Sequence, residues 1–168
     1  MNFEVCPFEA MDLEAFRGTS LTYGTAFEDW AQEIVALHQR DGHVWTGRWN
    51  GAVAAVAGYA EPWPGRACIW IAILDDFPQS VNGAVALALT RLGKKLIGQM
   101  THRRIEATVL AGFEAGERWA RMLGFKYEGT LRCYDPMGRD HHLFSIVRSE
   151  PWHHSSHSSA LSDHSLRV

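Results

Sequence analysis

Residues 104–129, RIEATVLAGFEAGERWARMLGFKYEG, contain the pattern that decides the fold of this chain. Apolar and polar residues alternate over 104–110, which predicts a strand with one buried face. Glu114 and Glu117 then open a helix at the end where negative charge is favoured. Gly124 is a natural C′ residue that ends this helix, and the residues after it begin another strand. The stretch therefore predicts a strand, a short helix and a second strand in succession.

The rest of the chain supplies further strands and helices around this unit. Asn50-Gly51 is a strong hairpin signal, because both turn positions tolerate positive φ. The apolar run at 67–74 fits a central strand buried on both faces. A long helix is predicted over 82–100, with a buried stripe at Val85, Leu89, Leu92, Leu96 and Met100. The other predicted elements are a strand at 2–7, helices at 12–16 and 26–40, strands at 43–49 and 52–60, and strands at about 125–134 and 141–148.

Length and composition are those of an ordinary globular protein. The chain has 168 residues, and we expect one domain at 1–150. A net charge of −3 gives no case for nucleic-acid binding, and no apolar run is long enough to span a membrane. Cys6, Cys68 and Cys133 are far apart and odd in number, which favours a reducing cytoplasm. Residues 151–168 are rich in Ser and His, and their composition predicts a disordered tail.

The element order and the wedge Trp119, Leu123, Gly124 and Phe125 resemble the GNAT N-acyltransferases. The resemblance implies an α/β (α+β) fold, with a mixed, mostly antiparallel sheet of six to seven strands flanked by about four helices. Residues 128–132, EGTLR, are similar to the subgroup of ribosomal-protein N-terminal acetyltransferases. A looser likeness links the chain to small GNAT-like proteins of tailed phages, including an internal virion protein.

The hexapeptide Gln79-Ser80-Val81-Asn82-Gly83-Ala84 is similar to the GNAT pattern Q/R-x-x-G-x-G/A, with Asn82 in place of the first Gly. In that family the pattern binds the pyrophosphate of acetyl-CoA through backbone N–H groups, which a helix N-terminus leaves without partners. The resemblance therefore implies acetyl-CoA as co-substrate, held by Gln79, Val81, Asn82, Gly83 and Ala84, with Leu74 at the end of the central strand. An ordinary capped helix start is the alternative reading of these residues.

Two side chains that often serve GNAT catalysis are replaced in this sequence. Ala120 stands where many members have the Tyr that protonates the thiolate, and Phe113 stands near the place of an Asn that touches the coenzyme. Glu106 is then the candidate general base and Tyr134 the candidate acid, with Tyr127 as another choice. For Glu106 the alternative is an exposed acid on a strand. His141 and His142 do not indicate a metal site, because neighbours on a strand point to opposite faces.

The resemblance thus implies an acetyl-CoA-dependent N-acetyltransferase acting on a small-molecule or protein amine. The alternative is a catalytically reduced GNAT-fold protein with a structural or assembly role, such as a virion component, and a CoA-binding regulatory module is a third possibility. A homo-oligomer and a virion partner both stay open, and we expect no partnership with nucleic acid or membrane.

Overall fold

The structure is a computed structural model that describes residues 3–17, 27–74 and 79–148; the side chains of residues 27, 28, 30 and 79–82 are outside the description. Its elements are β1 (Phe3–Pro7), the 3-10 helix η1 (Ala10–Phe16), α1 (Phe27–Asp41), β2 (Val44–Trp49), β3 (Ala52–Trp63), β4 (Arg66–Ile73), α2 (Gln79–Gln99), β5 (Arg104–Leu110), α3 (Glu114–Met122), β6 (Lys126–Leu131) and β7 (His141–Val147). The predicted tail at 151–168 lies outside the described residues. No helix in the described part is long and apolar enough to cross a membrane.

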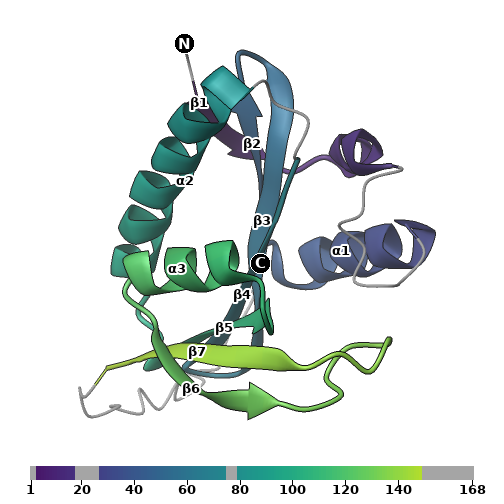
Figure 1. The fold of residues 1–168 in the computed structure, drawn as a ribbon. Coiled ribbons are helices and arrows are strands. Elements are labelled where there is room, and N and C mark those ends of the chain that lie inside the picture. Colours follow the sequence, from purple (N-terminus) through teal and green to yellow (C-terminus); the bar gives the residue numbers. More distant parts are fainter. Residues whose placement is uncertain (1–2, 18–26, 75–78, 149–168) are drawn as a thin grey trace, which may run out of the picture.

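Seven strands form one sheet in the order β1-β2-β3-β4-β5-β7-β6. Every neighbouring pair is antiparallel except β4 and β5, which run parallel. Figure 1 shows α2 and α3 on one side of the sheet and α1 on the other. This arrangement confirms the predicted fold class of a mixed, mostly antiparallel sheet flanked by helices.

Apolar side chains form a buried cluster on each face of the sheet. On the α1 face, the buried cluster consists of Phe8, Leu13, Phe16, Ile34, Val44, Val56 and Ala72. On the opposite face, the cluster beneath α3 consists of Ile97, Ile105, Ala120, Leu123, Phe125 and Phe144. Leu123 and Phe125 of the predicted wedge are thus part of the core, and Trp119 packs against them. The hairpin turn at Asn50 and Gly51 has the expected positive φ values of 48° and 85°.

Several predicted boundaries and burial patterns differ from the structure. Strand β3 continues to Trp63, three residues beyond its predicted end at residue 60. The long helix α2 begins at Gln79, three residues before the predicted start at residue 82. Pro78 precedes it in the sequence, and Pro favours the beginning of a helix. Strand β4 is less deeply buried than predicted: none of its residues is exposed, but only Ala67 and Ala72 are fully buried. Strand β6 ends at Leu131 rather than near residue 134, because a turn follows it at once.

Candidate functional site

The two parallel strands at the centre of the sheet pair over only a short length. Arg66 lies opposite Arg104, Ala67 opposite Ile105, and Cys68 opposite Glu106. Beyond these three pairs β4 stays paired with β3, and β5 stays paired with β7, so the two strands separate. We call the paired part the seam; the sheet opens from it toward the C-terminal ends of β4 and β5.

Helix α2 begins at Gln79, five residues after Leu74, at the open end of the seam. The first four N–H groups of an α-helix have no partner within the helix, and here they belong to residues 79–82. The predicted hexapeptide at 79–84 therefore forms the first turns of α2 rather than a loop before it. Gly83 and Ala84 are exposed, and a Cβ added at Gly83 would meet no atom within 4 Å. The start of α2 therefore has a small, open backbone that an anionic group could approach closely.

The backbone N–H of Leu74 has a hydrogen-bond partner within the protein. Its N–H donates a hydrogen bond of 3.0 Å to the carbonyl oxygen of Ala54, and its side chain packs against the core cluster on the α1 face. The N–H of Leu74 is therefore not available as a donor to a bound acyl group.

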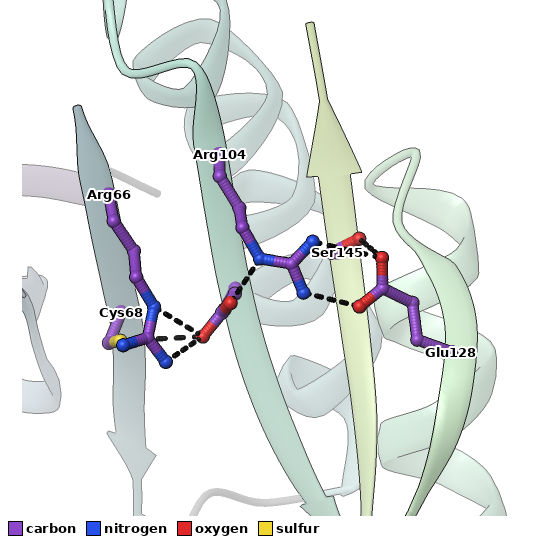
Figure 2. Close-up of polar contacts among 6 residues, drawn as sticks. Arg66, Cys68, Arg104, Glu128 and Ser145 are labelled. Atoms are coloured by element: carbon purple, nitrogen blue, oxygen red, sulfur yellow. Dashed lines mark hydrogen bonds and ion pairs between the residues drawn. The ribbon is translucent and has the colours of Figure 1, made fainter.

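Glu106 is the centre of a row of charged side chains across the sheet. Its Oε2 accepts hydrogen bonds from Arg66 Nε at 3.0 Å and Arg66 Nη2 at 2.5 Å, and its Oε1 accepts one from Arg104 Nε. Arg104 also donates to both carboxylate oxygens of Glu128, and Ser145 Oγ donates to Glu128 Oε1 at 2.6 Å. Figure 2 shows Arg66 on β4, Arg104 on β5 and Glu128 on β6 in a row across the sheet, with β7 between β5 and β6. We call these five residues the arginine–glutamate ladder.

The ladder determines the ionisation of Glu106. Burial by itself would raise the pKa of this carboxyl group, but the hydrogen bonds from Arg66 and Arg104 outweigh burial and hold the pKa below its usual value of 4.5. A carboxylate with a lowered pKa accepts protons weakly near neutral pH. Glu106 also belongs to the last parallel pair of the seam, opposite Cys68, where the two strands begin to separate. Its surroundings therefore suit an anchor between strands better than a general base.

Tyr134 lies in the connection between β6 and β7, at the opposite end of β5 from Glu106. The N–H of Ala111, just after β5, donates to the carbonyl oxygen of Asp140 in the same connection. Tyr134 is 53% exposed, and its ring lies 5.1 Å from that of His141, centroid to centroid. The structure thus brings Tyr134 to the open end of the sheet and does not bring it to Glu106.

A buried aspartate fixes the shape of this connection. Asp135 accepts hydrogen bonds from the backbone N–H groups of Met137 and Arg139 and from the Arg139 guanidinium. Burial acts to raise the pKa of Asp135, but these hydrogen bonds lower it to about 2. Asp135 is therefore ionised at neutral pH and holds the segment that carries Tyr134.

Ala120 and Phe113, which stand where many GNAT proteins have a Tyr and an Asn, both have packing roles in the structure. Ala120 is 4% exposed and packs in the cluster with Leu123 and Phe144. Phe113 comes directly before α3 and covers Gly116, where an added Cβ would lie 2.5 Å from its ring. Neither residue offers a group that can donate or accept a proton.

A histidine–glutamate pair on β7 and α3 was not among the predicted site residues. His142 Nδ1 lies 2.8 Å from Glu117 Oε1, and the ring of Tyr127 lies 5.2 Å from the His142 ring. The Tyr127 hydroxyl forms a hydrogen bond of 3.0 Å with the Thr130 hydroxyl.

Within residues 3–17, 27–74 and 79–148 no group of three metal-ligating side chains comes together.

No protein-family model matches the chain, and no curated protein matches it in sequence. Solved structures do match it in fold. A ribosomal-protein-alanine N-acetyltransferase from Brucella melitensis has a TM-score of 0.63 and 19% identity, over 86% of this chain and 99% of that one. A GNAT-family acetyltransferase from Bacillus anthracis has a TM-score of 0.65 and 15% identity, over 88% and 95%. The protein yncA from Salmonella typhimurium, solved with its cofactor acetyl-CoA, has a TM-score of 0.60 and 14% identity, over 86% and 93%. The chain therefore has the GNAT fold.

Proposed function

We propose that the protein is an acetyl-CoA-dependent N-acetyltransferase that acts on an amine of a small molecule or a protein. The observation that carries this proposal is the seam, which opens between β4 and β5 beside the first turn of α2. An opening of this kind gives a thioester access to the centre of the sheet, while the helix start offers N–H groups to an anion. The fold shared with a protein solved with acetyl-CoA supports the same reading.

In this proposal the start of α2 binds the pyrophosphate, with backbone N–H groups of Gln79, Val81 and Asn82 as donors. Gly83 and Ala84 leave room for close approach, because both are small and exposed. Bound acetyl-CoA supplies an activated acyl group to the amine. Tyr134 Oη, at the open end of the sheet, is the candidate proton donor. We assign Glu106 to holding the seam together, and we expect the enzyme to act in the cytoplasm.

Calorimetric titration with acetyl-CoA tests the binding part of the proposal. We expect Gly83→Glu to weaken binding about tenfold, because a carboxylate a few Å from a phosphate costs on the order of 1–2 kcal/mol. Gly98→Glu is the matched control: Gly98 lies on α2 near its other end, and a Cβ there also meets no atom within 4 Å. Equal affinities for both variants, or no binding by the unaltered protein, would refute acetyl-CoA binding at this site.

A second candidate function is a catalytically reduced GNAT-fold protein with a structural or assembly role, for example in a virion. Ala120 and Phe113 favour it, because one is buried in the core and the other covers Gly116. The release of free CoA thiol with a broad panel of amines separates the two candidates. Binding of acetyl-CoA without turnover of any amine would support the reduced protein.

A further inference from the structure

A cavity of about 370 Å³ lies between the C-terminal half of α2 and the sheet. Its walls are mainly apolar. They include Leu92 and Leu96 from α2, Ala57 and Tyr59 from β3, Ile69 from β4, and Trp45 from β2. We call this space the α2 cavity.

The sequence of the strands explains why this space is open. Ala55 and Ala57 lie on the side of β3 that faces α2, and both are small, so this part of the sheet leaves space beneath the helix. Leu96 belongs to the inward stripe of α2, yet it is 40% exposed. An apolar side chain on the inner side of a helix gains stability only when another apolar group covers it. Among the described residues, nothing fills the space in front of Leu96.

The α2 cavity is separate from the proposed acetyl-CoA site. Its lining continues through Gln99, Met100, Thr101 and His102, which are the last residue of α2 and the link to β5. The proposed pyrophosphate site is at the other end of the same helix. Because β4 and β5 pair at their N-terminal ends, the cavity lies toward the closed end of the sheet.

Arg148, the last described residue, is hydrogen-bonded to residues that line the α2 cavity. Arg148 Nη2 donates a hydrogen bond of 2.6 Å to the carbonyl oxygen of Ile97, and Nη1 donates to that of Met100. The backbone N–H of Arg148 donates to Arg103 at 2.9 Å. Ile97 and Met100 both line the cavity, so the chain leaves β7 beside it.

We propose that Trp152, in the C-terminal segment that follows Arg148, docks into the α2 cavity and covers Leu96. Trp152 is four residues beyond Arg148, so an extended chain can carry it about 13 Å, roughly the length of α2 from Leu92 to Met100. The residues that follow it, HHSSHSS, have no large apolar side chain. An indole ring brings a large apolar surface at small cost in side-chain entropy, which suits a cavity of this size and character.

Binding of the neutral apolar dye N-phenyl-1-naphthylamine to the full-length protein tests this docking. We expect the Trp152→Ala variant to bind the dye at least tenfold more tightly than the unaltered chain, because the cavity becomes available. Trp63→Ala is the matched control, since Trp63 is 53% exposed on the β3–β4 hairpin and does not line the cavity. Adding Ala57→Leu to Trp152→Ala should reverse the gain by narrowing the cavity.

Fluorine NMR of the chain labelled with 5-fluorotryptophan gives a second measurement that does not depend on the Ala variant. The Trp152 signal is assigned by its loss in Trp152→Phe, and we expect Leu96→Ala to shift it. A Trp152 signal at the position of an unfolded chain, or equal dye binding by all variants, would overturn the proposal. The proposal would also be overturned if the unaltered protein bound the dye only after dilution and sedimentation showed a dimer. The cavity would then be covered by a second copy of the chain.

Discussion

Replacing Glu106 by glutamine removes the charge that joins Arg66 to Arg104 while it keeps the size of the side chain. The carboxylate is 6% exposed and accepts three hydrogen bonds from two guanidinium groups. Losing one partner of a fully buried pair costs about 3–5 kcal/mol. The side chains of Arg66 and Arg104 are 25% and 29% exposed, so water replaces part of the interaction. We therefore expect the free energy of unfolding to fall by about 2–3 kcal/mol at neutral pH.

This loss should depend on pH in a defined direction. Because the folded protein lowers the pKa of Glu106 below 4.5, ionised Glu106 stabilises the fold fully above that value. The stabilisation disappears as the pH falls through the lower pKa of the folded state. Urea unfolding at a series of pH values should show a constant difference between the unaltered protein and Glu106→Gln above about pH 5, and a shrinking difference below it.

The same variant separates an anchor from a general base. As an anchor, Glu106 contributes to stability, and Glu106→Gln should retain the rate of acetyl transfer within about threefold at a temperature where it is folded. As a base, its removal would lower the rate by about 10²–10⁴-fold. Glu128→Gln is the control, since Glu128 belongs to the same ladder but is more exposed, and it should cost less stability. A Glu106→Gln protein of unchanged stability and much reduced activity would refute the anchor role.

Two further substitutions probe how the helices and strands pack. Gly58→Ala should lower the free energy of unfolding by about 3 kcal/mol in thermal unfolding, because the added Cβ would lie 2.4 Å from the carbonyl oxygen of His43. The control is Gly129→Ala, since Gly129 is also in a strand but has open space around it. Thr90→Val should lower the free energy of unfolding, measured with urea, by about 1 kcal/mol, because it removes the acceptor of the 2.8 Å hydrogen bond from Trp119 Nε1. Thr90→Ser keeps that acceptor and should lower the free energy of unfolding less. A Gly58→Ala protein as stable as the Gly129→Ala control, or equal losses for the two Thr90 variants, would contradict these packing arguments.

Local patterns predicted the fold well where the physics is local. The alternation before Ala111, the acids that open α3 and the glycine after Leu123 are each effects of neighbouring residues, and the strand–helix–strand unit they predict is present. The turn at Asn50-Gly51 also follows from two residues alone. These signals predicted the elements in chain order, while their arrangement in one mixed sheet was implied by the resemblance to the GNAT proteins.

Features that depend on register between distant strands were not predictable in the same way. Arg104 and Glu106 are two apart on one strand, so their shared face could be read from sequence. Their partners Arg66 and Glu128 come from other strands, and only the pairing of β4, β5, β7 and β6 brings them together. The exposure of Leu96 was likewise hidden, because it depends on small residues across the sheet from α2.

The short seam also divides the molecule into two parts that can lose structure separately. One part contains β1 to β4 and the other contains β5 to β7, and each is held by longer antiparallel pairing than the three parallel pairs between them. Local unfolding follows the boundary with the fewest bonds, so backbone amides on the two sides should exchange with solvent as two cooperative units. A ligand that contacts both β4 and β5 would make the two units unfold together. Amide exchange on both sides of the seam would then slow to the same extent when the ligand binds.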